Sequence, residues 1–145
     1  MKQCFLFGHH QATEAVGILL RDELHRHIRE YGISCFVVGH YGAFDRIAAK
    51  QLSFVKAQMP SIRLYLLCPY HPTERPVSLP PLFDGSLYPP SMESVPPRFA
   101  ILRANRYMLS QCDYAIGCVQ NTHGNAAALA TYAQSLRHLT LTLIP

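Results

Sequence analysis

The stretch GHYGAFDRIAAK, residues 39–50, places an acid among glycines, behind an apolar run and ahead of a helical pattern. Glycines such as Gly39 and Gly42 let backbone N–H groups approach an anion at the start of a helix. Asp45 lies in the first turn of that helix, where it would repel a phosphate but would cap the helix well. Its carboxylate can also accept hydrogen bonds from sugar hydroxyls or from the edge of a base. We therefore expect Asp45 to face the hydroxylated part of a ligand, with capping alone as the alternative.

Other residues with useful chemistry follow the remaining apolar runs. Gly8 comes after the first run, and Gly124 stands just before the last helical pattern. Each of these glycines either turns the chain tightly or admits a ligand. Asn105 and Arg106 lie on a helical pattern before the fourth apolar run. Arg106 is either a solvated surface residue or a clamp for a phosphate or carboxylate.

Five of the eight histidines belong to the same set of loops: His9, His10, His40, His71 and His123. Polar residues collect in the loops of any protein, so this gathering alone assigns no function. A metal site needs neutral imidazoles that are oriented by further partners, and the nearby carboxylates are scattered. We therefore expect no metal.

The pattern of apolar residues predicts five strands and four helices in alternation. The strands are short continuous apolar runs, typical of parallel strands covered on both faces, and they are expected at 3–7, 34–38, 62–67, 113–118 and 139–144. The helices have apolar residues at intervals of three and four, and they are expected at 13–31, 43–58, 98–111 and 125–136. Thr13 is the expected N-cap of the first helix, and Gly32 is its expected C-terminal stop.

This alternation predicts an α/β fold, with residues 1–145 as a single doubly wound, Rossmann-like domain. We expect a five-stranded parallel sheet in the order 3-2-1-4-5, with helices on both faces and the last strand at an edge. Ligands of such sheets bind beyond the carboxyl ends of the strands, at the switch point between strands 1 and 4. The proline-rich segment 68–98 shows no helical pattern. Because it leaves strand 3 beside this crevice, we interpret it as a long binding loop or lid.

The composition fits a compact globular protein, with 49% hydrophobic and 15% charged residues. The net charge of +4 is modest and scattered, which argues against duplex DNA as a partner and is compatible with an anionic small ligand. No apolar stretch approaches the length of a membrane span, and no signal peptide is recognisable. We expect a cytosolic protein that folds alone or as a homo-oligomer such as a dimer. The five cysteines form no CxxC pair, which predicts buried, reduced thiols.

Four segments together resemble the SLOG superfamily over nearly the whole chain, and within it the uncharacterised bacterial YpsA-like branch. They are CFLFGHH, VGHYGAFDRIAA, IRLYLLCPY and NRYMLSQCDYAIGCVQNTHGNAAALATYA. The resemblance implies a Rossmann-like fold that binds nucleotides or nucleotide derivatives. The sequence indicates no cofactor beyond such a bound nucleotide or nucleotide-derived ligand. The resemblance also implies ligand contacts at Gly8, Gly39, Gly42, Asp45, Asn105, Arg106, Gly124 and Asn125, to which we add their neighbours His9, His10, Phe44 and His123.

The chain departs from the pattern of its suggested relatives at two places. The YpsA-like branch usually has an arginine after Gly-His, whereas His10 stands here, so a positive contact is weaker or depends on pH. The related LOG phosphoribohydrolases cleave the N-glycosidic bond of nucleoside monophosphates, and they have PGGxGTxxE where this chain reads VQNTHGNAAALA. Ala128 takes the place of their catalytic glutamate. Because a carboxylate stabilises the transition state of this cleavage, we rank catalysis below binding.

Three functions remain open on the sequence. The first is the binding or sensing of a nucleotide or nucleotide derivative in the crevice. The second is an N-glycosidase or another nucleotide hydrolase, with Asp45 and Arg106 as the candidate catalytic residues beside a histidine. The third, by analogy with the DNA-processing protein A branch, is the binding of single-stranded nucleic acid through Tyr70, Tyr88 and Arg98, against which the modest charge argues.

Overall fold

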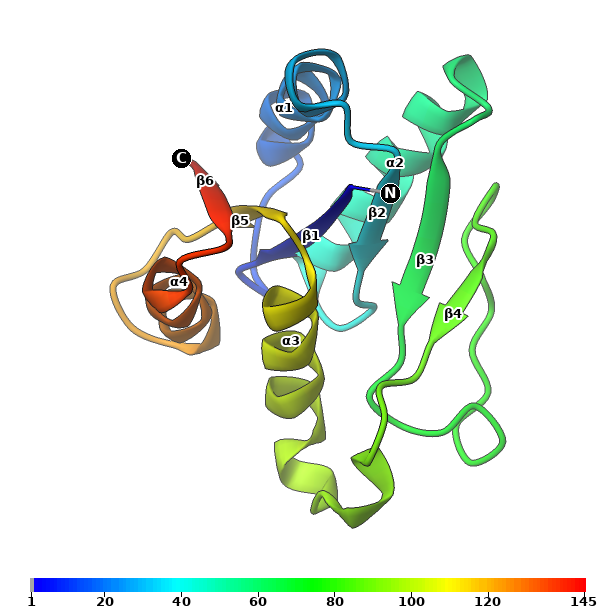
Figure 1. The fold of residues 1–145 in the computed structure, drawn as a ribbon, viewed down its shortest axis with the longest axis vertical. Helices are drawn as coiled ribbons and strands as arrows, with labels where there is room; N and C mark the ends of the chain where they lie inside the picture. The colour runs from blue at the N-terminus through cyan, green and yellow to red at the C-terminus, as the bar shows by residue number, and fades with distance from the viewer. Residues whose placement is uncertain (1) are drawn as a thin grey trace.

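The computed structural model describes residues 2–145, which form a parallel sheet between two layers of helices (Figure 1). The elements are β1 (Gln3–Gly8), α1 (Ala15–Tyr31), β2 (Cys35–Val38), α2 (Ala43–Gln58), β3 (Arg63–Leu67), β4 (Gly85–Leu87), η1 (Met92–Ser94), η2 (Pro97–Phe99), α3 (Ala100–Gln111), β5 (Tyr114–Cys118), α4 (Asn125–Ser135) and β6 (Thr140–Ile144). The elements η1 and η2 are single turns of 3₁₀ helix. This architecture is α/β, as the alternation of sequence patterns predicted.

The sheet has six strands in the order β4-β3-β2-β1-β5-β6, and all neighbours are parallel. The prediction of five strands is therefore wrong by one, and the order derived from it is incomplete. The additional strand, β4, lies outside β3 and pairs Gly85 with Tyr65. Its three residues form no apolar run, so no local pattern marks it as a strand. β6 lies at the opposite edge, as predicted from its alternating polarity.

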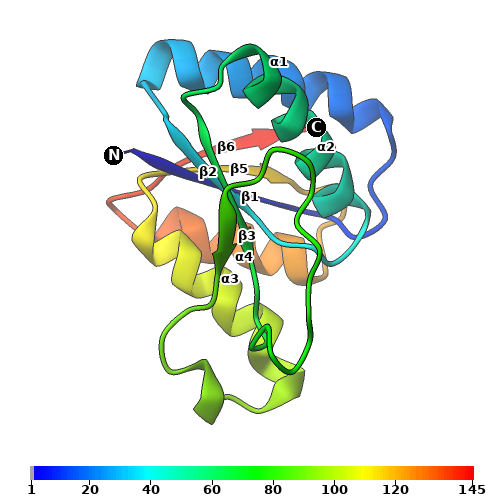
Figure 2. The ribbon, with the colours of Figure 1, turned by 90° about the vertical axis from the view of Figure 1, so that its right-hand side faces the viewer.

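The helices cover the sheet in pairs, α1 with α2 on one face and α3 with α4 on the other (Figure 2). Leu20 and Leu52 belong to the core on the first face, and Leu109 and Leu129 to the core on the second. Successive residues of a strand point into opposite layers, so all four residues of β2 are buried. This arrangement explains why the central strands read as continuous apolar runs.

The proline-rich segment 68–98 is more ordered than its sequence predicted, since it contains β4, η1 and part of η2. Asp84 anchors it: one carboxylate oxygen accepts from the Leu64 backbone N–H at 2.8 Å and from Lys56 at 2.5 Å. The hydroxyl of Ser53 on α2 donates to the Pro81 carbonyl at 2.6 Å. These contacts tie the first half of the segment to α2 and β3, and Figure 2 shows it running beside α2. The sequence pattern missed them because each partner lies 20 or more residues away.

Two helix starts differ from prediction. The N-cap of α1 is Glu14 rather than Thr13, and no side chain caps this end. Thr13 instead accepts the Val16 N–H with its backbone carbonyl, in the turn that precedes the helix. The third helix was expected from residue 98, but η2 occupies 97–99 and α3 begins at Ala100.

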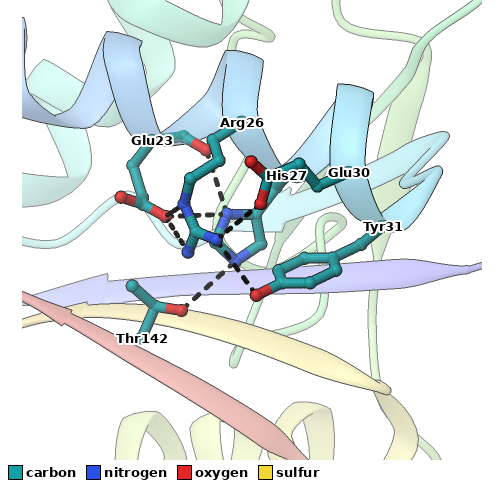
Figure 3. A network of polar contacts seen from close by, with 6 residues as sticks. All are labelled: Glu23, Arg26, His27, Glu30, Tyr31 and Thr142. Atoms are coloured by element: carbon teal, nitrogen blue, oxygen red, sulfur yellow. Dashed lines mark hydrogen bonds and ion pairs between the residues drawn. The ribbon is translucent and has the colours of Figure 1, made fainter.

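His27 is fully buried where α1 meets β6 (Figure 3). Its Nδ1 donates to the Glu23 carbonyl at 2.9 Å, and its Nε2 lies 3.5 Å from the Thr142 hydroxyl. The ring also meets the edge of Tyr31, at 5.0 Å between centroids. Burial lowers the pKa of His27, so the ring is neutral near pH 7. This polar cluster fastens α1 to the edge strand of the sheet.

Candidate functional site

A cavity of about 500 Å³ lies at the carboxyl ends of the central strands. It is lined by residues 5–8 of β1, by the loops that follow β1 and β2, and by the start of α4. Another side is lined by Ile101 of α3 and, one helical turn further on, by Ala104 and Asn105. The cavity therefore lies between strands whose connections pass to opposite faces of the sheet, which is where ligands of doubly wound sheets bind.

Two helices begin at this cavity with the same backbone conformation. Gly42, the N-cap of α2, has φ 104° and ψ 173°, and Gly124, the N-cap of α4, has φ 102° and ψ −177°. Side chains other than hydrogen rarely tolerate these angles, so both positions require glycine. Both glycines line the cavity, and Asn125 and Ala126 of the first turn of α4 line it as well. Backbone N–H groups at the start of α4 are thereby available to an anion.

Asp45 lines the cavity in the first turn of α2. Its Oδ2 accepts a hydrogen bond from the Tyr41 backbone N–H at 3.0 Å, which is its only hydrogen bond to residues 2–145. Burial raises the pKa of Asp45 to about 7, and the Tyr41 N–H opposes this shift. The carboxyl group thus bonds to the loop before its own helix and also faces the cavity. Both roles considered for Asp45 in the sequence, capping and ligand contact, are compatible with this placement.

Two of the candidate glycines lie against side chains. A methyl group on Gly8 would lie 2.3 Å from Cγ of Phe44, and one on Gly39 would lie 2.8 Å from Oδ2 of Asp45. Gly8 therefore lets α2 pack closely on β1, and Phe44 is fully buried beneath it. Phe44 does not line the cavity, so its contact is with the core.

The histidines that the sequence grouped together separate in the structure. His9 and His10 line the cavity with ring centroids 4.9 Å apart, and Nε2 of His9 lies 2.7 Å from the side-chain amide of Asn121. His40 lines a neighbouring groove, whereas His71 and His123 line neither hollow. Within residues 2–145, no three His, Cys, Asp or Glu side chains gather as a metal ion would require.

Asn105 lines the cavity, but its neighbour Arg106 does not. The guanidinium of Arg106 is exposed and lies 5.1 Å from the ring centroid of Tyr132 on α4. Successive residues of a helix point about 100° apart, so only one of these two neighbours can face the cavity. The structure brings Asn105 to the site together with Asp45, and it leaves Arg106 outside.

The structure adds residues that the sequence interpretation overlooked. Tyr41, Pro69 and Ile101 line the cavity, and Arg46 and Arg75 line the groove beside it. Arg46 follows Asp45 directly and lies in the motif itself, so its position was a signal that could have been used. Arg75 lies in the proline-rich segment, and no local pattern shows that this segment returns to α2.

No family model and no curated protein sequence matches this chain. The site is therefore interpreted from its own geometry. It combines the start of α4, with its backbone N–H groups, and the half-buried carboxyl group of Asp45 at the start of α2, around a largely apolar cavity.

Proposed function

We propose that the cavity binds a nucleotide or nucleotide derivative, in a protein of the SLOG superfamily. The observation that carries the proposal is the cavity at the switch point, with the start of α4 and the Asp45 carboxyl group both facing it. A phosphate suits the backbone N–H groups near Gly124, and sugar hydroxyls suit the carboxylate of Asp45. The apolar lining, including Ile101 and Leu129, suits the face of a base.

This placement separates the negative charge of the ligand from the negative charge of the protein. Asp45 belongs to the start of α2, whereas Gly124 and Asn125 belong to α4, across the cavity. Arg106 takes no part in the proposed binding, since it lies outside the cavity. His9 and His10 also line the cavity: His9 lies beside Asn121 of the loop before α4, and His10 lies against Gly42 at the start of α2.

Isothermal titration with adenosine 5′-monophosphate, adenosine and inorganic phosphate tests the proposal. We expect the nucleotide to bind more tightly than either part alone, and Asp45→Asn to weaken its binding about tenfold through the lost charged hydrogen bond. Asn105→Ala should weaken it as well, whereas the matched control Arg106→Ala, one residue further along α3, should bind as the parent does. The absence of binding by a full panel of nucleotides and dinucleotides would contradict the proposal.

A nucleotide hydrolase is the second candidate, and the pKa of about 7 at Asp45 is the observation that favours it. A carboxyl group with a pKa near the working pH is suited to general acid or base catalysis. If the protein hydrolyses the N-glycosidic bond, incubation with a nucleoside monophosphate should release free base, and Asp45→Asn should abolish the release. If no product forms over hours at a saturating concentration of nucleotide, the hydrolase proposal fails and binding remains as the proposed function.

We further propose a cytosolic location. All five cysteines are free and buried, as expected of a protein in a reducing compartment. Within residues 2–145, no helix combines the length and apolar character needed to cross a membrane. Light scattering of the purified protein would measure whether it forms the homodimer that the sequence allows.

A further inference from the structure

A second hollow, which we call the α2 groove, lies between α2 and residues 75–82 of the proline-rich segment. Its volume is about 970 Å³, and it adjoins the cavity through the shared residues Gly39, Tyr41, Gly42 and Asp45. Figure 2 shows the two segments that form it, α2 and the chain beside it. The nucleotide proposed for the cavity leaves this groove unused.

Three cationic side chains line the α2 groove: Arg46 and Lys50 from α2 and Arg75 from the facing segment. Arg46 and Lys50 are four residues apart, so they are neighbours on one helix face. Across residues 2–145, none of the three forms an ion pair. Like charges at this spacing repel, and a cation near the start of a helix is opposed by the helix dipole. An anion between these side chains would relieve both effects.

The remainder of the groove is mostly apolar and open to solvent. Phe54, one turn beyond Lys50, is 49% exposed, and Leu82 on the facing segment is 50% exposed. Leu82 also has a φ of +68°, which is an unusual conformation for a bulky side chain. Val77 and several prolines complete this part of the lining. The groove therefore offers an apolar surface next to its cations.

His40 also lines the groove. Its Nε2 is shielded from solvent and has no hydrogen-bond partner in the described chain. Asp45 is the only carboxyl group that lines the groove, and its Oδ2 is already bonded to Tyr41. The charged side chains that line the groove are thus mainly cations, namely Arg46, Lys50 and Arg75, and the guanidinium of Arg75 is held 3.7 Å from the ring centroid of Tyr70.

We propose that the α2 groove is a second binding site, for an amphipathic organic anion that carries a phosphate or carboxylate on an apolar or aromatic body. The anion would meet Arg46, Lys50 and Arg75, and the body would lie against Phe54 and Leu82. Three cations gathered in one hollow suit a single anionic group. A nucleic-acid strand instead needs a track of positive charge along the surface.

Titration calorimetry with 1-naphthyl phosphate tests this site, with 1-naphthol and inorganic phosphate as its uncharged and its purely anionic parts. We expect the whole molecule to bind at least about tenfold more tightly than either part, since both halves of the groove contribute. Lys50→Gln, Arg75→Gln and Phe54→Ser should each weaken binding several-fold. Leu82→Gly removes the apolar side chain and also the unfavourable φ, so this variant should fold and still bind more weakly.

The matched control is Arg103→Gln, which removes an exposed arginine of α3 that lines neither hollow. This variant should bind 1-naphthyl phosphate as the parent does. If Arg103→Gln weakens binding as much as Lys50→Gln or Arg75→Gln, the effect comes from the overall charge of the protein, and the proposal is overturned. Failure of 1-naphthyl phosphate to bind, or equal binding of 1-naphthol, would overturn it too. Displacement by an oligothymidylate that binds more tightly would assign the groove to nucleic acid instead.

Asn105→Ala separates this site from the cavity, because Asn105 lines the cavity alone. The variant should lose affinity for adenosine 5′-monophosphate and keep its affinity for 1-naphthyl phosphate. If adenosine 5′-monophosphate displaces 1-naphthyl phosphate, and the variant weakens both, the groove is no second site. Failure of the nucleotide alone to bind would contradict only the proposed function of the cavity.

Discussion

Asp45 shows how one side chain can satisfy the backbone and still face a ligand. Its Oδ2 bonds to the Tyr41 N–H, and this bond stabilises the loop between β2 and α2. The same carboxyl group packs on Gly39 and lines both hollows. Burial makes its ionised form costly, so its pKa lies near 7 rather than at the ordinary carboxyl value of 3.8.

At the residue scale, Asp45→Asn should change how stability depends on pH. Because the folded pKa of Asp45 is raised, its contribution is fully present below about pH 3.8 and is lost as the pH rises through about 7. A rise in pKa from 3.8 to about 7 corresponds to about 4 kcal/mol of unfolding free energy, which we expect the parent to lose across this interval from Asp45. The variant should lack this loss, so its advantage over the parent should grow with pH.

Urea unfolding of both proteins at pH 4, 6 and 8 measures this difference. Asp22→Asn is a suitable control, since Asp22 is exposed on α1 far along the chain from the site. A difference between Asp45→Asn and the parent that stays constant with pH would show that the carboxyl group titrates normally.

At the scale of elements, Asp84 joins the proline-rich segment to the rest of the fold. It accepts from Lys56 on α2, from Arg63 on β3 and from the Leu64 backbone, and it directly precedes β4. The hydrogen bond from Lys56 is the main reason that the pKa of Asp84 is lowered. β4 has only three residues, so this side chain contributes much of what holds the strand at the edge of the sheet.

Asp84→Ala should therefore loosen β4 and the groove wall that precedes it. We expect a loss of about 1 kcal/mol at pH 7, because the Leu64 N–H loses its partner and the surface ion pairs add little. The lowered pKa means that this stabilisation is present above about pH 3.8 and is lost as the pH falls through the folded pKa. The variant and the parent should thus become similar in acid.

Limited proteolysis between residues 70 and 84 provides the local measurement, since cleavage reports opening of this segment. Glu93→Ala, in the second half of the segment, is the control and should be cleaved as the parent is. Unchanged cleavage of Asp84→Ala would indicate that the contacts of Ser53 and Phe83 suffice to hold the segment.

At the scale of the whole molecule, two titratable groups with shifted pKa values change stability with pH in opposite directions. His27 fastens α1 to β6, and its lowered pKa means that stability is full above about pH 6.5 and is lost as the pH falls. Asp45 acts at the carboxyl ends of the strands and favours lower pH. Between the folded pKa of His27 and pH 6.5, the two contributions to stability therefore change in opposite directions and largely offset each other.

His27→Leu tests the acid side of this profile. Between pH 6.5 and the folded pKa of His27, the parent should lose up to about 1.4 kcal/mol per pH unit relative to the variant, the limit for the uptake of one proton on unfolding. The variant should be less stable than the parent at pH 7, because it loses the contacts to Glu23 and Thr142, and this deficit should shrink as the pH falls from 7 to 5. Thermal unfolding of the parent and the variant across this pH range measures both effects. Thr142→Val is the control, because it keeps the imidazole. Parallel stability curves for His27→Leu and the parent would contradict a role of His27 in the pH dependence.

The elements of this fold were largely predictable from short-range patterns. The intervals of three and four in α2 and the continuous apolar runs of β1, β2 and β5 follow from burial on a helix stripe or between two layers. These patterns also place Gly42, Asp45 and Gly124 at one edge, because all parallel strands end on the same side of a sheet. Such information is local, and a single sequence contains it.

The sequence by itself determined the α/β class, most element boundaries and the edge at which a site can form. The tertiary structure alone decided that β4 joins the sheet, that Gly8 packs on Phe44, that Asn105 rather than Arg106 faces the cavity, and that Arg75 comes to lie across from Arg46. Each of these facts depends on partners far apart in the chain. Local propensity carries no signal for such a pairing, because its free energy arises only when both layers have packed against the sheet.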